Sequence, residues 1–453
     1  MKTVISIVIS FIFISNLTLS QKMTYISTSK AIEDIEFLIK NIEEIHYNPY
    51  FMTSKEYFNR NKKDLINKFA PDSIPYRQFI PVAMKLVALM SGGHTSMSWK
   101  NESIIPELKN FIYIPFTGKL TDNLESFIVT KSATSEIKIG EKIESINGIS
   151  IVDLYNECMS YIGGIPTYKN ANTEIIFPLL LFYNQKISAP YAIDFVDSER
   201  KYISPGLAIS ELLELINEGS IIENYTFEIL GNDIGLITYN KCQDYKAFEK
   251  FTKSTFKALK EKNINKLIID IRQNGGGNSD LNDLLLSYIT EKQYRQSSGR
   301  YWKVSEQSKK AYKENNYEKF LGEEFMSAYY ALENQSILND FSDEMVHPEK
   351  PKNYFSGKTC FLIGPSTFSS ANFLADAVKT YKLSTLVGTS TGEYTNDFGE
   401  QLTFILPHSG SSIYVSSTYD IGANGNPDIF EPVSPNIEVK ENVLEYAVKW
   451  FGK

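Results

Sequence analysis

The first regular pattern in the chain is a helical spacing of apolar residues. From Ala31 to Met90, apolar residues recur every three or four positions, and prolines interrupt the run. This spacing predicts a small helical domain, which we set at residues 21–95. Two glycines at 92–93 end the last helix, so His94 lies at a turn that leads into a strand-like segment.

A second region, residues 111–222, has short runs typical of β-strands. Examples are FIYIPF, SFIVTK and EKIESINGISI. The last of these has the form of two strands joined by a tight turn at Asn147-Gly148, a pair that favours hairpins. These runs predict a compact β-rich module.

From residue 223 to residue 453, strand and helix patterns alternate. The apolar runs KLIIDI and TCFLIG are each followed by a glycine-containing loop and a helical pattern. Such alternation predicts an α/β core with parallel strands. Residues 291–352 interrupt it with a polar segment rich in lysine and tyrosine, which we interpret as a helical insertion.

Residues 1–20 have the pattern of a secretory signal peptide. Lys2 precedes an apolar run from Val4 to Ile14, and small residues follow up to Ser20. The run is well short of the roughly 20 residues that cross a bilayer, so we expect cleavage after Ser20 rather than a membrane anchor. The mature chain is therefore expected to be exported, to the periplasm or outside the cell, without stable membrane insertion.

Composition narrows the classes of partner. The 453 residues are 42% hydrophobic, which provides for a sizeable core, and the net charge is −8 without a basic cluster, which argues against nucleic acid binding. The three cysteines, Cys158, Cys242 and Cys360, are too widely spaced to indicate disulfides or a metal site. Cys360 lies inside an apolar strand and is expected to be in the core.

Two loops carry the candidate chemistry. In GPSTFSSAN, a strand breaks and a helix begins near Ser369 and Ser370, so that an oxyanion would meet the unpaired N–H groups of the first helical turn. In DIRQNGGGN, three glycines follow an apolar strand but lack the lysine of a phosphate-binding loop. Loops at the carboxyl ends of neighbouring parallel strands share one crevice, so one loop can supply a nucleophile and the other an oxyanion donor. The simpler interpretation is that Ser369 or Ser370 caps the helix.

Four motifs in order carry a resemblance to a known family. They are GGHTS, IKIGEKIESING, KLIIDIRQNGGG and TFSSANFLADAVKTYKLSTLVGTSTG. Together they resemble the C-terminal processing (tail-specific) and tricorn-like serine peptidases of the S41 class, over nearly the whole mature chain. The resemblance implies a crotonase-like (ClpP/crotonase) α/β core, a PDZ-like module that binds peptide ends, and a helical N-terminal region. It also implies peptide or protein substrates and no cofactor.

The motifs assign roles to particular residues. Ser369 matches the nucleophile, and the N–H of Ser370 with that of Gly275 or Gly276 matches the oxyanion hole. The processing branch uses a lysine base after the VGxxTxG strand, but residues 388–400 contain no lysine. His94 is then the base, because the tricorn-like branch has a histidine in the corresponding early motif.

A histidine base needs an acid to fix its tautomer and to stabilise the imidazolium. The tricorn-like branch takes a carboxylate from the C-terminal region, where we prefer Asp428 and keep Glu431 and Glu400 as alternatives. The sequence thus predicts an exported serine peptidase that forms an acyl-enzyme on Ser369. The rival hypothesis is a non-catalytic protein of the same fold that carries an apolar ligand or a peptide, as retinoid-binding relatives of this fold do.

Overall fold

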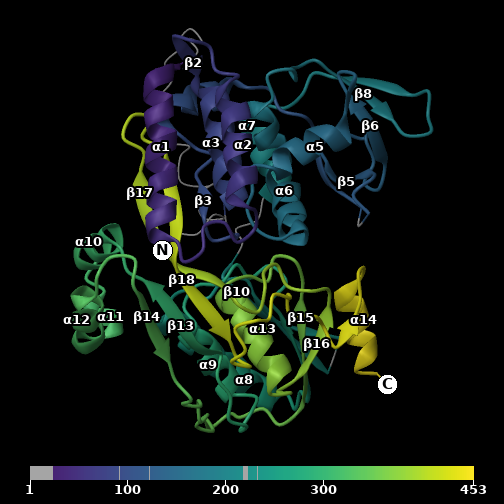
Figure 1. Ribbon diagram of the computed structural model, residues 1–453. Coiled ribbons are helices and arrows are strands. Elements are labelled where there is room, and N and C mark those ends of the chain that lie inside the picture. The colour runs from purple at the N-terminus through teal and green to yellow at the C-terminus, as the bar shows by residue number, and fades with distance from the viewer. Residues whose placement is uncertain (1–23, 91, 122, 218–222, 232, 453) are drawn as a thin grey trace.

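The structure is a computed structural model that describes residues 24–90, 92–121, 123–217, 223–231 and 233–452 (Figure 1). The predicted signal peptide, residues 1–20, lies outside these ranges. Among the described residues, no helix combines the length and the apolar character that a membrane span requires.

Within the described residues of the region 21–95 there are three helices and a two-stranded sheet. Helix α1 begins after Ser27, whose side chain accepts a hydrogen bond from the N–H of Lys30, and its buried stripe includes Ile35, Leu38 and Ile42. Helix α3 has a buried face with the predicted spacing, whereas α2 buries only Phe58 and the short strands β1 and β2 were not predicted. The bounds are β1 Tyr25–Ser27, α1 Thr28–Ile45, α2 Lys55–Ile66, β2 Ser73–Pro75 and α3 Tyr76–Met90.

The module at 111–222 is built on an antiparallel sheet in the order β4-β5-β6-β8-β9, with β7 paired to β6. The predicted turn at Asn147-Gly148 joins β6 to β7, and both residues have positive φ (52° and 75°), as a two-residue hairpin requires. The strands are β4 Phe116–Leu120, β5 Phe127–Ser132, β6 Lys142–Ile146, β7 Ile149–Ser150, β8 Tyr191–Phe195 and β9 Lys201–Ser204. The helices of this region are α5 Ile151–Met159, α6 Pro166–Leu180 and α7 Ile209–Asn217, and α4 Ile105–Asn110 lies just before it.

The α/β core is built on a sheet in the order β10-β11-β12-β15-β16-β19. Strand β10 is antiparallel to β11, and the remaining neighbours are parallel, as predicted. The strands are β10 Tyr225–Leu230, β11 Ile234–Tyr239, β12 Lys266–Asp270, β15 Lys358–Ile363, β16 Thr385–Gly388 and β19 Ile437–Glu438. The helices are α8 Tyr245–Glu261, α9 Asp280–Ser287, α13 Ser370–Thr380 and α14 Val443–Trp450.

Helices cover both faces of this sheet, and the strands alternate their side chains between them. In β12, Leu267 and Ile269 pack in the cluster with α8, α9 and α13, whereas Ile268 packs with Cys360 in the cluster with α14. This two-residue period explains why the middle of the strand, Leu267 to Ile269, is apolar at every position: both faces of the strand are buried there. Cys360 is in the core, as predicted.

A second sheet, in the order β14-β13-β18-β17, corrects the prediction for residues 291–352. This segment is not purely helical, because it begins and ends in strands that pair with each other, and β13 also pairs with β18. The polar residues of β13 hid the strand pattern, since Arg300 is half-buried and pairs with Glu400 and Asp420. The bounds are β13 Ser297–Lys303, α10 Glu306–Glu314, α11 Glu318–Leu321, α12 Glu323–Ala331, β14 Ile337–Phe341, β17 Asp397–Ile405 and β18 Ser412–Gly422.

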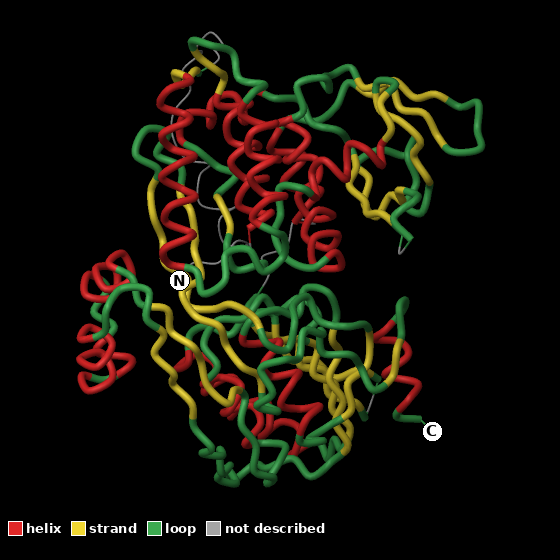
Figure 2. The backbone as a smooth tube through the Cα atoms, in the orientation of Figure 1, coloured by secondary structure: helices red, strands yellow, loops and turns green. Residues whose placement is uncertain are grey.

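The hairpin of β17 and β18 joins the two halves of the molecule. Figures 1 and 2 show it running from beside α1 in the upper half to the core sheets in the lower half. The start of β18 pairs with β3 (Ser96–Met97), and its end pairs with β13. Because β3 follows His94 by two residues, this pairing holds the GGHTS turn next to the core.

Candidate active site

Ser369 lies at a sharp turn between β15 and α13. Its φ of 55° and ψ of −129° are sparsely populated for a residue with a side chain, and such strain is typical of exposed nucleophiles at strand-to-helix turns. Only the backbone carbonyl of Ser369 accepts the N–H of Asn372, and the serine hydroxyl makes no capping hydrogen bond. The capping interpretation therefore does not hold for Ser369.

Ser370, the rival serine, has its hydroxyl engaged in the structure. Its Oγ donates to the Gly277 carbonyl at 2.6 Å and accepts from the Ser279 hydroxyl at 3.1 Å. The side chain is also buried, at 5% exposure. Of the two serines, Ser369 is the one with a hydroxyl left for chemistry.

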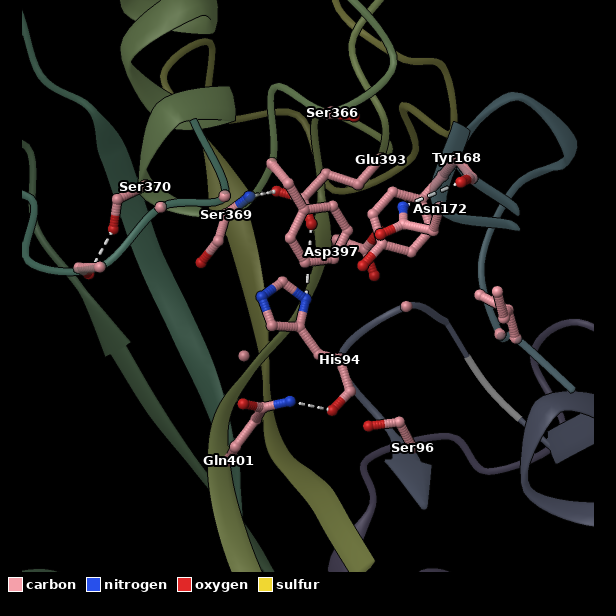
Figure 3. Close-up of a pocket in the computed structure, with 18 of the residues that line it drawn as sticks. His94, Ser96, Tyr168, Asn172, Ser366, Ser369, Ser370, Glu393, Asp397 and Gln401 are labelled. Atoms are coloured by element: carbon pink, nitrogen blue, oxygen red, sulfur yellow. Dashed lines mark hydrogen bonds and ion pairs between the residues drawn. The ribbon is translucent and has the colours of Figure 1, made fainter. Parts of the chain in front are cut away.

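His94 lies on the other side of the same cavity, within a stack of three rings. Its imidazole stacks on Phe368 at a centroid distance of 4.4 Å, and Tyr168 of α6 stacks on the opposite face of Phe368 at 4.5 Å. The Gln401 side chain donates to the His94 carbonyl. Figure 3 shows the side chains of His94 and Ser369 pointing toward each other. Burial lowers the pKa of His94 to about 4, so the ring is neutral near pH 7, the form in which a base accepts a proton.

The carboxylate next to His94 belongs to Glu393. Its Oε2 is 3.4 Å from His94 Nδ1, and its Oε1 accepts the backbone N–H of Ser369 (Figure 3). The Glu393 side chain is buried, at 3% exposure, and that of His94 is mostly buried, at 13%. With Nδ1 facing Glu393, the Nε2 of His94 is the nitrogen left for the Ser369 hydroxyl.

This geometry replaces the acid that we predicted. Asp428 is exposed on a turn in which its own N–H bonds to Asn426, and Glu431 is exposed as well. Glu400 forms an ion pair with Arg300 at 2.6 Å. None of the three is recorded in contact with His94 among the described residues, whereas the Glu393 carboxylate lies 3.4 Å from it.

Glu393 was not predicted, because the resemblance implies a carboxylate nearer the C-terminal end, where Asp428, Glu431 and Glu400 are the candidates. The structure shows why Glu393 is held in place: an added Cβ at the neighbouring Gly392 would lie 2.1 Å from the Pro365 carbonyl oxygen. A carboxylate that follows a glycine required by the nucleophile loop is held against that loop.

The glycine loop lies against the turn that contains Ser369. A Cβ at Gly276 (φ 90°) would be 2.6 Å from the Ser369 Cβ and 2.9 Å from the Ser370 nitrogen. The Gly276 N–H already donates to Asn274 Oδ1 at 2.9 Å. Within the described part of the chain, no acceptor is recorded for the N–H of Gly275 or of Ser370. Of the two glycines, Gly275 is thus the one with a donor available for an oxyanion.

A second carboxyl group, Asp397, lines the cavity near Glu393. Burial raises the pKa of Asp397 to about 7, and the charge of Asp420 adds to the rise. Burial also raises the pKa of Glu393 well above its usual range, and the nearby charge of Asp397 raises it further. The ionisation of Glu393 therefore depends on Asp397.

The cavity that holds these residues has a volume of about 2990 Å³ and is lined by both halves of the molecule. His94 and Tyr168 line it from the upper half, and Gly275, Ser369 and Glu393 line it from the core. Such a space accommodates an extended peptide as well as a small molecule. Among the described residues, no group of three or more His, Cys, Asp or Glu side chains is arranged to hold a metal ion.

A strained serine, a histidine with a buried carboxylate, and backbone donors beside the serine are the groups that a serine hydrolase of the acyl-transfer type uses. The comparisons with known proteins add the family. Residues 233–439 match the model of "Peptidase family S41", a range that includes Ser369 and Glu393 but not His94. This match supports an S41 peptidase, and the chain is a serine-type peptidase.

Solved structures share the fold at low sequence identity. A mutant of CPAF gives a TM-score of 0.69 at 14% identity, over 94% of this chain and 96% of that one. Mature CPAF complexed with lactacystin gives 0.63 at 14% identity, over 94% and 96% of the two chains. A search of curated proteins finds no match. The mixed α/β fold of these structures is the fold of this chain.

Proposed function

We propose that the protein is an exported peptidase in which Ser369 is the nucleophile, His94 the general base and Glu393 the acid that orients His94. The observation that carries this proposal is the bridge made by Glu393. One of its oxygens accepts the N–H of Ser369, and the other lies 3.4 Å from His94 Nδ1. One carboxylate thus fixes the nucleophile and the base relative to each other.

The proposed reaction proceeds in two steps. The Ser369 Oγ–H bond breaks as the proton passes to His94 Nε2, and Oγ forms a bond to the peptide carbonyl carbon. The N–H groups of Ser370 and Gly275 stabilise the negative oxygen, and the imidazolium then protonates the leaving amine as the C–N bond breaks. Water, deprotonated by His94, attacks the acyl-enzyme and releases the second product.

The finer assignments of fold are also part of the proposal. A parallel sheet with helices on both faces and the active serine at a strand-to-helix turn supports a crotonase-like core. The antiparallel sheet of the 111–222 module, with its β6–β7 hairpin, supports a PDZ-like module that guides peptide ends toward the cavity.

Peptide hydrolysis by the purified mature chain tests the function. We expect cleavage of a fluorogenic peptide library or of an unfolded protein, and we expect Glu393→Gln to lower kcat by about 10⁴, since a neutral amide neither fixes the tautomer nor stabilises the imidazolium. Asp428→Asn is the matched control and should retain the wild-type rate. Absence of cleavage, together with retention of an apolar ligand in the cavity, would favour the binding-protein hypothesis.

Export is tested separately by expressing the full chain with its first twenty residues. We expect the protein in the periplasm or medium with an N-terminus at Gln21, as determined by intact mass. A full-length chain that stays in the cytoplasm would contradict this part of the proposal.

The pH dependence of the reaction follows from the carboxyl groups around His94. Because the Glu393 pKa is raised well above its usual range, its charged form is present only above that raised value, and kcat/KM should fall as the pH drops through it. His94, with a pKa of about 4, is not the source of this fall. The other ionisable groups near Glu393 are Asp420 and Tyr168. Neither of them gains charge when the pH is lowered over this range.

Asp397→Asn tests which group causes this fall of kcat/KM at low pH, the acid limb of the pH profile. The variant keeps an oxygen to accept the Phe398 N–H, now 2.7 Å from Asp397 Oδ1, but removes the negative charge near Glu393. The Glu393 pKa should then fall, and the acid limb of kcat/KM should move to lower pH. A limb that stays in place in Asp397→Asn would show that another group controls it.

Ser370→Ala is expected to have a moderate effect. The variant keeps the backbone N–H of residue 370 but loses the hydrogen bond to the Gly277 carbonyl, with a loss of about 1 kcal/mol in the free energy of unfolding. Labelling of Ser369 by a fluorophosphonate should continue at a rate reduced several-fold. Complete loss of labelling in a folded Ser370→Ala protein would move the nucleophile to Ser370.

A further inference from the structure

Four buried polar side chains lie behind the candidate oxyanion hole and take no part in the proposed reaction. They are Tyr239, Cys242, Asn274 and Asn282, each with an exposed fraction of at most 1%. These side chains contact one another in series. One end of the series reaches Ser370 and the other reaches the glycine loop, the two segments that supply the N–H groups of the candidate oxyanion hole.

Asn282, on α9, is at the centre of these contacts. Its Nδ2 donates to the Ser370 carbonyl at 2.8 Å and to Gln296 Oε1 at 2.9 Å. Its Oδ1 accepts from the Tyr239 hydroxyl at 3.2 Å and from the Cys242 thiol at 3.5 Å. Both donors and both acceptor sites of this amide are therefore used, and one of them holds the first residue of the nucleophile helix.

The same thiol leads to the glycine loop. Cys242 Sγ lies 3.6 Å from Asn274 Oδ1, and that oxygen accepts the Gly276 N–H at 2.9 Å. The backbone of Cys242 holds the loop as well, because its N–H donates to the Gly276 carbonyl at 3.1 Å and its carbonyl accepts the Asn278 N–H at 2.8 Å. The Asn274 carbonyl accepts the Phe368 N–H at 3.0 Å, next to the nucleophile.

We infer that Asn282 is a positioning residue, which sets the Ser370 N–H and the glycine loop at the separation that binds an oxyanion. The inference rests on the proposed function. It follows from the geometry, because Asn282 contacts Ser370 directly and reaches the loop through Cys242 and Asn274. An oxyanion is stabilised only when both donors point to one position, so a small relative shift of the two halves weakens the transition state more than the bound substrate.

A purely structural role makes a different prediction from a positioning role. Loss of a buried hydrogen-bonded side chain that serves only stability would lower the thermal midpoint and affect all ligands alike. Loss of a residue that positions the oxyanion donors affects only ligands that develop a negative oxygen. The two roles are therefore separated by a pair of ligands that differ only in this respect.

The test uses a tripeptide aldehyde and the matching alcohol, built on a sequence that the wild-type protein cleaves. The aldehyde carbon forms a bond to Ser369 Oγ, the carbonyl electron pair moves to the oxygen, and the serine proton passes to His94. The alcohol fills the same subsites without forming an oxyanion. We expect Asn282→Ala to bind the aldehyde at least tenfold more weakly than wild type and the alcohol within about twofold.

Cys242 provides the second pair of variants, which keeps the test decisive if Asn282→Ala does not fold. Cys242→Ala removes the link between Asn282 and Asn274 and should weaken the aldehyde several-fold, whereas Cys242→Ser keeps a donor and should restore much of that affinity. Thr252→Val is the matched control, because it removes a buried hydrogen bond, 3.0 Å to the Phe248 carbonyl, from α8. Its aldehyde-to-alcohol ratio should equal that of wild type.

Each result has one meaning. Equal loss of aldehyde and alcohol affinity in Asn282→Ala, or no loss in either ligand, would overturn the positioning role. A wild-type protein that binds the aldehyde no more tightly than the alcohol would instead refute the acyl-transfer mechanism, and the inference with it.

Discussion

Ser369→Ala is expected to abolish peptide hydrolysis, with a fall in kcat of about five to six orders of magnitude. The reason is the loss of the only atom that forms the covalent bond to the substrate. The hydroxyl makes no capping hydrogen bond, so the fold should tolerate its removal. We expect the thermal midpoint of Ser369→Ala to stay within about 2 °C of wild type by calorimetry or circular dichroism, because the variant deletes one oxygen at a cavity surface.

Ser366→Ala is the matched control for this variant. It changes the same residue type in the same loop, and it should retain turnover within about twofold. Two results would contradict the assignment of Ser369 as the nucleophile. One is measurable hydrolysis by Ser369→Ala above the rate expected for a site without its nucleophile. The other is an equal loss of turnover in Ser366→Ala.

His94→Ala is expected to lower kcat by about 10⁴ to 10⁶ while KM changes little. The physical reason is that the serine proton then has no acceptor, since residues 388–400 contain no lysine. The variant also leaves Glu393 Oε2 without the imidazole that now lies 3.4 Å away. A neutral buried carboxyl accommodates this loss, so we expect the protein to remain folded.

His94→Gln separates the base from its packing. Glutamine keeps a polar group near Glu393 but does not act as a base, so its rate should be as low as that of His94→Ala. His408→Ala, at the hairpin of β17 and β18, is the matched histidine control and should keep the wild-type kcat. Turnover of His94→Gln near the wild-type rate would show that a different base operates.

The local sequence pattern was sufficient to predict most elements of the fold. The helical spacing of α1, the Asn147-Gly148 turn and strand β12 with its apolar centre each follow from residues near in sequence, and the structure has them where they were expected. Strand β13 could not be predicted in this way. Its Arg300 is compatible with a sheet only because Glu400 and Asp420, more than ninety residues away, neutralise it.

The candidate site likewise contains residues with a local sequence signal and a residue that depends on distant contacts. Ser369 and His94 lie in motifs with a local signal, a broken strand and a pair of glycines. Glu393 has no such signal, since its partnership with His94 depends on the way β3 pairs with β18 and brings the GGHTS turn to the core. Asp428 was the natural choice from sequence order, but its exposed turn gives a carboxylate no burial and no contact with the base.

The most direct test of the central claim is to map the covalent adduct of a fluorophosphonate on the mature chain by mass spectrometry of its peptides. An activated serine reacts readily with this reagent, whereas a serine that only caps a helix does not. The account predicts one adduct per chain, on Ser369, which disappears in His94→Gln and persists in Asp428→Asn. An adduct on Ser370, or no adduct on the folded wild-type protein, would contradict it.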